Sequence, residues 1–142
     1  MSRILKVAAA QLGPITLKEP RSSAVKRMIV LMQNAKAQGA DLVVFPELAL
    51  TTFFPRWFTE DQSEIDKYFE TEMPSKETKP LFVEARKLKI GFNFGFAELV
   101  EEEGVTRHFN TAIIVDQNGE IAGKYRKIHL PGHTQNEPWR AF

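Results

Sequence analysis

The chain has 142 residues, of which 43% are hydrophobic and 26% charged, the balance of one soluble globular domain of ordinary size. Its 19 basic and 18 acidic side chains leave a net charge of +1, which gives no footprint for nucleic acid or an anionic membrane as a partner. The chain has no cysteine, so disulfides and a thiol nucleophile are excluded within these residues.

The amino-terminal segment is apolar, but it predicts a strand and not a secretory leader. Lys6 interrupts it, and no small-residue cleavage pattern follows. Elsewhere no apolar run approaches the roughly 18–20 residues that span a bilayer. We therefore expect no membrane partner and a cytoplasmic location.

The first three segments predict a βαβ unit, in which two parallel strands flank a helix. Residues Ile4–Gln11 favour a strand, although the alanines at 8, 9 and 10 could also extend a helix. A helix is expected next, capped by Ser22 or Ser23 and ended by Gly39 in the C′ position. Its apolar stripe consists of Val25, Met28, Ile29, Met32 and Ala35. A second strand, Leu42–Phe45, follows directly.

Glu47 comes immediately after that second strand. The strand is short, apolar and β-branched in the middle, which predicts burial on both faces, and Pro46 ends it because proline cannot donate to the ladder. Open α/β sheets bind ligands at the carboxyl ends of their strands. Burial there raises the pKa of a carboxylate and suits it to proton transfer. The alternative, that Glu47 caps a turn or pairs with a surface lysine, stays open on this stretch alone.

Residues 51–58 are aromatic and broken by proline. They include Phe53 and Arg56, which suggests a loop that lines an active site with apolar surface and one arginine. An irregular segment tucked into the core explains the composition almost equally well.

The rest of the chain predicts two helices and then three strands. The helices are expected over residues 60–69 and 75–88, separated by Met73-Pro74, and Leu81, Phe82, Ala85 and Leu88 form the buried stripe of the second. The strands are expected over residues 90–99, 107–115 and 121–126, joined by turns at residues 101–104 and 116–119. Gly91 and Gly95 leave room for another backbone or side chain to approach.

Metal and phosphate chemistry have little support. His129 and His133 are four residues apart, but Pro131-Gly132 between them rules out the helical presentation that zinc sites of that spacing use. No Gly-rich phosphate loop joins a strand to a helix, and no serine lies in a Gly-x-Ser-x-Gly turn. We therefore expect neither a metal nor a cofactor.

The basic cluster of residues 124–130 is typical of a solvated surface, with one detail that indicates otherwise. Lys127 stands where a strand ends, as Glu47 does. If the two strand ends meet, a carboxylate able to take a proton lies beside an ammonium able to stabilise an oxyanion, which suits acyl transfer. Spacing in the sequence does not establish that they meet.

Two motifs resemble the first two catalytic motifs of the nitrilase (carbon–nitrogen hydrolase) superfamily. They are Val43-Val44-Phe45-Pro46-Glu47 and Gly123-Lys124-Tyr125-Arg126-Lys127-Ile128-His129-Leu130, with Asn110-Thr111-Ala112 before the second. Residues 47–57 and 68–74 are most similar to N-carbamoyl-D-amino-acid amidohydrolases. The resemblance covers the chain from its first strand onward, so residues 1–142 are expected to be the amino-terminal part of a single domain.

The resemblance implies an α/β fold, a four-layer αββα sandwich of which this chain supplies roughly the first half. It implies that Glu47 is the general base and Lys127 the residue that stabilises the oxyanion. Asn110, Tyr125 and His129 are expected to support the site, and a complete chain is expected to form a homo-oligomer.

The family mechanism also requires a cysteine nucleophile, which in the family lies beyond the lysine motif. We therefore expect residues 1–142 alone to be inactive and the complete enzyme to hydrolyse a small-molecule N-carbamoyl amino acid. Related amidases that act on N-carbamoylputrescine, a β-ureido acid or a simple amide are alternatives. A hypothesis of another class is a non-catalytic binding module, since half of such a fold leaves one sheet face apolar and uncovered.

Overall fold

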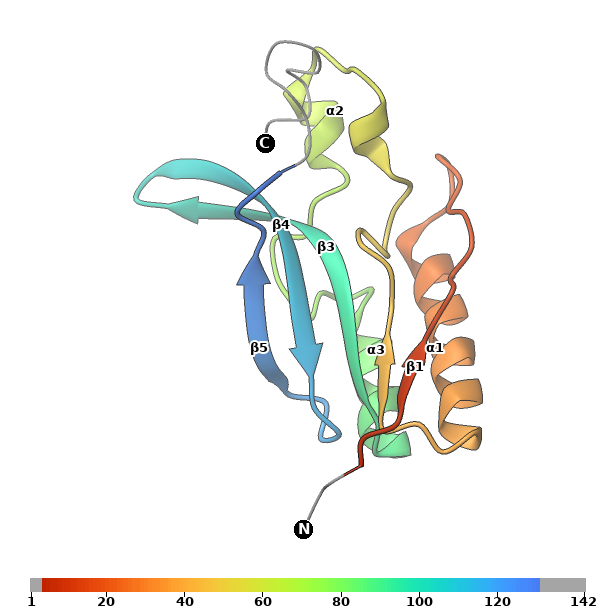
Figure 1. Ribbon diagram of the computed structural model, residues 1–142. Coiled ribbons are helices and arrows are strands. Elements are labelled where there is room, and N and C mark those ends of the chain that lie inside the picture. Colours follow the sequence, from red (N-terminus) through yellow and green to blue (C-terminus); the bar gives the residue numbers. More distant parts are fainter. Residues whose placement is uncertain (1–3, 131–142) are drawn as a thin grey trace.

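The computed structural model describes residues 4–130. Its elements are β1 (Val7–Ala9), α1 (Arg21–Ala37), β2 (Leu42–Val44), the 3-10 helix η1 (Phe54–Arg56), α2 (Gln62–Asp66), α3 (Lys79–Leu88), β3 (Gly91–Glu102), β4 (Val105–Val115) and β5 (Ile121–Arg126). Figure 1 shows the five strands as one sheet, with α1 and α3 side by side against one of its faces.

The strands lie in the sheet in chain order. β1, β2 and β3 are parallel to one another. β4 is antiparallel to β3, and β5 is antiparallel to β4. Val7 lies opposite Leu42, and α1 connects these two strands, so the predicted βαβ unit is confirmed. The β3–β4 hairpin is longer than predicted and closes through Glu103 and Gly104, both in the left-handed region at φ 54° and 77°. Such a two-residue connection matches the twist of the paired strands.

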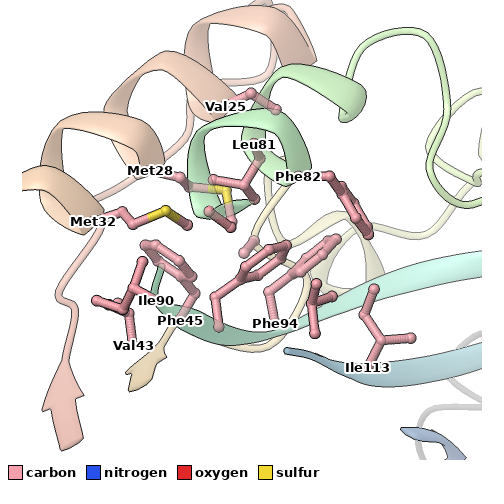
Figure 2. Close-up of a cluster of buried hydrophobic side chains, with 14 of the residues drawn as sticks. Val25, Met28, Met32, Val43, Phe45, Leu81, Phe82, Ile90, Phe94 and Ile113 are labelled. Atoms are coloured by element: carbon pink, nitrogen blue, oxygen red, sulfur yellow. The ribbon is translucent and has the colours of Figure 1, made fainter. Parts of the chain in front are cut away.

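The hydrophobic core fills the space between the sheet and the two helices (Figure 2). Met28 and Met32 of α1 and Leu81 of α3 are completely buried. From the sheet, Phe92 packs edge-to-face on Phe82 of α3, with ring centroids 5.2 Å apart. The helical spacing of the apolar residues therefore predicted correctly which side of each helix faces the sheet.

The other face of the sheet is open within residues 4–130. Val7 and Ile114 are 54% and 41% exposed there. On β2, Val43 and Phe45 are buried against the helices, but Val44 between them is 37% exposed. The expectation that residues 42–45 are buried on both faces is therefore wrong for the described part of the chain, because helices cover only one face of this sheet.

One edge of β3 is paired along most of its length by three separate segments. β2 pairs with its beginning. Gly95 then donates its N–H to the carbonyl of Pro46 and accepts from the N–H of Ala49 at 2.9 Å. Farther along, Glu70 forms an isolated parallel bridge opposite Glu98. Backbone groups of β3 that β2 is too short to reach are therefore satisfied by loops.

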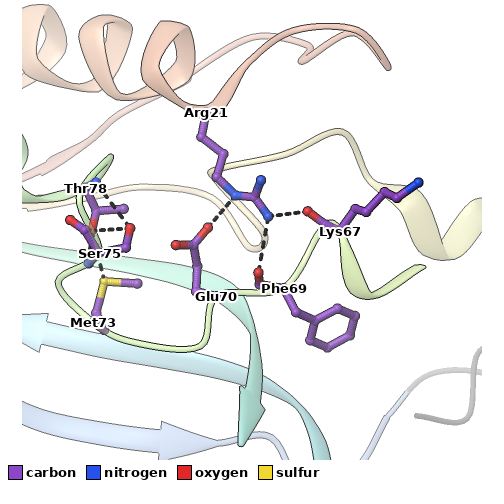
Figure 3. A network of polar contacts seen from close by, with 7 residues as sticks. All are labelled: Arg21, Lys67, Phe69, Glu70, Met73, Ser75 and Thr78. Carbon is purple, nitrogen blue, oxygen red and sulfur yellow. Dashed lines mark hydrogen bonds and ion pairs between the residues drawn. The ribbon is translucent and has the colours of Figure 1, made fainter. Parts of the chain in front are cut away.

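Arg21, at the start of α1, anchors the last of these segments (Figure 3). Its guanidinium donates to the carbonyl oxygens of Lys67 at 2.5 Å and Phe69 at 3.2 Å, and it pairs with the carboxylate of Glu70. The Glu70 side chain is only 6% exposed. A buried carboxylate needs such a partner, so this ion pair holds the loop between α1 and the sheet.

Helix α1 begins at Arg21 with Pro20 as its N-cap residue, and no side chain caps it, so the predicted cap at Ser22 or Ser23 is wrong. Proline supplies the extended N-cap backbone, at φ −72° and ψ 149°. At the other end Gly39 has φ 79° and follows the C-cap residue, as predicted. No helix in residues 4–130 has the length and apolar character needed to cross a bilayer.

Three further elements are shorter than predicted, and local contacts account for the starts of the two helices. β1 covers only part of the predicted residues 4–11. Helix α2 occupies the middle of the predicted residues 60–69, and Asp61 caps it by accepting the N–H of Ser63 at 2.8 Å. Helix α3 begins four residues later than predicted, because the Thr78 hydroxyl accepts the N–H of Ser75 at 2.8 Å and closes a separate turn first (Figure 3).

Replacing Met32 by alanine should cost about 2–5 kcal/mol of unfolding free energy, because the side chain is completely buried between α1 and the sheet. Val30, which is 54% exposed on the same helix, provides the matched control, and Val30→Ala should stay within about 0.5 kcal/mol. Denaturant unfolding of the intact protein measures both. Equal losses for the two variants would mean that α1 packs through another face.

Candidate active site

Glu47 lies in a tight turn just beyond the end of β2. Its neighbour Leu48 has φ 49°, a left-handed conformation that is uncommon for a non-glycine residue. Leu48 is 3% exposed and packs in a small apolar cluster with Phe54, Phe69 and Ala97. Burial of the Leu48 side chain thus stabilises this uncommon backbone conformation, and the turn in turn fixes the position of the Glu47 backbone.

Gly95 of β3 allows this turn to lie directly on the sheet. A Cβ at position 95 would be 3.2 Å from the Cα of Glu47 and 3.2 Å from the backbone nitrogen of Leu48. The prediction that Gly95 leaves room for another backbone is therefore confirmed. Ala97, the next residue on the same side of β3, is also small, and it lies opposite Asn110 of β4. Because residues 95 and 97 are small, the side chains of Glu47, beyond the end of β2, and Asn110, on β4, can meet across β3.

Asn110 and Lys127 both reach Glu47. The amide Nδ2 of Asn110 donates to Oε1 of Glu47 at 2.6 Å, and Nζ of Lys127 donates to the same oxygen at 2.7 Å. The backbone N–H of Lys127 donates to the carbonyl of Asn110 at 2.8 Å, so the ladder between β4 and β5 continues to Lys127. Residues from the ends of β2 and β5 and the middle of β4 thus form one group.

The pKa of Glu47 is lowered, which corrects the expectation of a raised pKa. Burial, the largest single influence, does raise the pKa of this carboxyl. Hydrogen bonds from Lys127 and Asn110, together with the positive charge of Lys127, outweigh it. Glu47 is therefore ionised at neutral pH and able to accept a proton.

The two oxygens of the Glu47 carboxylate are not equivalent. Both donors, Asn110 and Lys127, bind Oε1. Among the contacts within residues 4–130, no donor binds Oε2. A carboxylate held through one oxygen keeps the other available for a proton from an incoming group.

A cavity of about 250 Å³ opens beside Glu47. It is lined by Phe53 and Arg56 as well as Glu47 itself, and by residues 12–15 on the other side. Phe54 lies between Phe53 and Arg56 in sequence but is buried, and it stacks on Tyr68 with centroids 4.8 Å apart. The two interpretations of the aromatic segment thus apply to different residues. Phe53 and Arg56 line the cavity, and Phe54 belongs to the core.

Tyr125 and His129 do not join the hydrogen-bonded group around Glu47. Tyr125 lies on β5 opposite Ala112 and is 56% exposed. His129 is exposed just after β5. Seven site residues were proposed. The structure joins Glu47, Asn110 and Lys127 by hydrogen bonds. It places Phe53 and Arg56 on the cavity that Glu47 also lines, and it leaves Tyr125 and His129 exposed to solvent.

Metal ligation is not supported by the described residues. No three His, Asp or Glu side chains in residues 4–130 come together in an arrangement that could hold an ion. His133, named in the sequence analysis, lies outside that range. The chemistry that the group around Glu47 can perform is proton acceptance beside a fixed cation, which suits a reaction at a carbonyl.

The sequence analysis missed Glu98. This residue of β3 is 5% exposed, and its carboxylate accepts hydrogen bonds from Thr111, Lys124 and Arg126 on the helix side of the sheet. The alternation of side chains along β5 could have indicated such a residue. If Lys127 points to the face that carries Glu47, then Lys124 and Arg126 point to the opposite, inner face. Two cations directed to the inner face of a sheet require an acid there.

Comparison with known proteins gives one family over nearly the whole chain. Residues 6–141 match the family described as carbon-nitrogen hydrolase. Among curated relatives, a formamidase of Bacillus thuringiensis (strain Al Hakam) is 34% identical over 137 residues. That match covers 90% of this chain and 37% of the formamidase, so the chain spans little more than a third of the relative's length.

Solved structures agree on the fold. A carbon-nitrogen hydrolase from Helicobacter pylori G27 superposes with a TM-score of 0.72 at 21% identity, covering 96% of this chain and 43% of that one. A variant of the amidase from Nesterenkonia sp. AN1, with acrylamide added at its active site cysteine, gives 0.70 at 20% identity, covering 92% and 46%. At these identities the likeness concerns the fold alone, and the fold is partial.

Replacing Gly95 by alanine should displace the turn that carries Glu47, because the new Cβ meets only backbone atoms at 3.2 Å. We expect a loss of about 1–3 kcal/mol in unfolding free energy. Gly123→Ala is the matched control, since its Cβ would meet the side-chain Cγ2 of Ile114 at 3.1 Å, and Ile114 is 41% exposed and free to turn. Denaturant unfolding compares them, and a harmless Gly95→Ala would show that the close approach is not required.

Replacing Lys127 by methionine should raise the pKa of Glu47, because one hydrogen bond and one charge that lower it are removed. Titration of the ¹³C-labelled carboxyl, assigned with Glu47→Gln, measures the change. Because the folded-state pKa of Glu47 lies below its ordinary value, ionised Glu47 stabilises the fold above that ordinary value. This stabilisation disappears as pH falls through the folded-state pKa. A Glu47 pKa that Lys127→Met leaves unchanged would contradict the ion pair.

Proposed function

This chain belongs to the carbon–nitrogen hydrolase family, and we propose that it is the amino-terminal part of an amidohydrolase and supplies two of its catalytic residues. The observation that carries the proposal is the contact between Glu47 and Lys127, which are 80 positions apart in the sequence and 2.7 Å apart in the fold. A surface ion pair would not need a strained turn, a glycine in the neighbouring strand and a third side chain, Asn110, to support it.

In the proposed reaction Glu47 is the general base and takes its proton on Oε2, the oxygen that neither Asn110 nor Lys127 binds. The ammonium of Lys127 donates to the oxyanion that forms when the carbonyl is attacked. Asn110 holds the carboxylate in place. Because the pKa of Glu47 is lowered, the base is ready in its ionised form at neutral pH.

The nucleophile has to come from outside this chain, which has no cysteine. The resemblance to the nitrilase superfamily implies a cysteine thiol, and the Nesterenkonia amidase has an active site cysteine. Its thiol would give a proton to Glu47 and attack the carbonyl carbon. The amine would leave with that proton, and water would then cleave the thioester. By this route residues 1–142 alone are inactive.

Two substrate classes have separate support. Residues 47–57 and 68–74 resemble N-carbamoyl-D-amino-acid amidohydrolases, and Arg56 beside the cavity could contact a carboxylate on such a substrate. The formamidase relatives favour a simple amide, which would not need Arg56. The shared conclusion is hydrolysis of a non-peptide C–N bond, and assays with an N-carbamoyl amino acid and with formamide separate the two classes.

A non-catalytic binding module remains the alternative of another class. The open sheet face, with Val7, Val44 and Ile114 exposed, favours it. The convergence of Glu47, Asn110 and Lys127 has no role in such a module, which is why we rank hydrolysis first. A cytoplasmic location and homo-oligomeric assembly stay predictions.

In the intact protein, Glu47→Gln should abolish turnover, because an amide accepts no proton at neutral pH. Lys127→Ala should lower kcat by about 10²–10³, the effect of removing an oxyanion donor. Steady-state assays on the substrate that the wild type hydrolyses measure both. Lys87→Ala, which removes a lysine that is 71% exposed on α3, is the control and should retain far more activity. Wild-type rates for Glu47→Gln would overturn the assignment of the base.

A further inference from the structure

Glu98 lies on the face of the sheet opposite the candidate active site. It belongs to β3, and its side chain is 7% exposed. Oε2 accepts from the hydroxyl of Thr111 at 2.7 Å and from Nε of Arg126 at 2.9 Å, while Oε1 pairs with Nζ of Lys124. A single buried carboxylate therefore joins β3 to both β4 and β5.

The partners of Glu98 are sequence neighbours of the residues that reach Glu47. Thr111 follows Asn110 on β4, and Arg126 precedes Lys127 at the end of β5. Thr111 and Arg126 lie directly opposite each other in the ladder. Because side chains alternate between faces, fixing Thr111 and Arg126 on one face sets the position of the next side chains on the other.

Arg126 is held by more than Glu98. Its Nη1 donates to Glu102 at 2.8 Å, and its guanidinium lies 3.8 Å from the ring centroid of Phe109. Backbone pairing adds to this anchor, since the strand position of Glu98 is bridged by Glu70. Within residues 4–130 β5 is an edge strand, paired on one side only, so the side-chain contacts of Arg126 add to the single ladder that holds its end.

We propose that Glu98 is a positioning residue for the active site, one that holds Asn110 and Lys127 against Glu47 by fixing Thr111 and Arg126 from the opposite face. The proposal rests on the proposed function where it concerns turnover, but its geometric part concerns Glu47 alone. Glu98 touches neither Glu47 nor the cavity beside it. A substitution of Glu98 is therefore expected to change the geometry of Glu47 and Lys127 and to leave the binding of substrate unchanged.

Glu98→Gln tests the proposal in the intact protein. Glutamine keeps the size of the side chain but replaces one of the two accepting oxygens by an NH2 group, which only donates, so that it cannot accept from both Arg126 and Lys124. We expect the pKa of Glu47 to rise toward its ordinary value, because Asn110 and Lys127 bind it less well. We expect kcat to fall by about 10²-fold, the cost of a displacement near 1 Å, with KM nearly unchanged.

Glu70→Gln is the matched control. Glu70 is a second carboxylate of similar burial, paired with Arg21, and among the described residues its side chain makes no hydrogen bond or ion pair with β4 or β5. It should lower stability without changing the pKa of Glu47. If Glu98→Gln does not fold, Arg126→Lys provides a second variant, which keeps the charge but loses the two-sided contact with Glu98 and Glu102.

The two readouts separate the two proposals. A raised pKa of Glu47, measured by ¹³C carboxyl titration in Glu98→Gln or Arg126→Lys but not in Glu70→Gln, supports the positioning role even if no amide substrate is found. A Glu47 pKa and kcat that stay at their wild-type values in a folded Glu98→Gln would overturn it. An increase in KM alone would do the same, since it would place Glu98 in substrate binding.

Discussion

The hydrogen bonds along both edges of β3 are the constraint on which the rest of the molecule depends. On one edge β4 pairs with the strand over nearly its whole length. On the other edge β2 is too short, and the turn at Pro46–Ala49 and then Glu70 complete the pairing. The turn carries Glu47 and the bridging segment carries the buried Glu70, so satisfying the backbone of β3 also places these two carboxylates.

Regular patterns made most of the fold predictable from the sequence. The helical stripe that contains Met28 and Met32 identified the buried face of α1 correctly, because burial depends on periodicity. The strand predicted over residues 90–99 is confirmed by β3. A nitrilase-like α/β fold, present in part, is confirmed. Helix starts were predicted less well, since Pro20 and the Ser75–Thr78 turn act through local geometry that periodicity does not contain.

The candidate site was predictable in its residues but not in its electrostatics. The ends of two strands predicted that Glu47 and Lys127 could meet, and they do. The direction of the Glu47 pKa shift was wrong because burial was inferred from the apolar strand before it. In the fold, burial does raise the pKa, but the hydrogen bonds of Lys127 and Asn110 and the charge of Lys127 together outweigh it. Glu98 was missed because its three partners come from two other strands and become neighbours only once the sheet forms.

The alternation of side chains between the two faces also limits how this sequence can change over time. Thr111 and Arg126 face the helices while Asn110 and Lys127 face Glu47. An insertion or deletion of one residue within β4 or β5 would exchange these two sets and place the wrong side chains on each face. Such an event would disrupt the contacts of Glu98 and those of Glu47 together. Descendants of this chain can therefore exchange residues along these strands far more freely than they can change strand length by one residue.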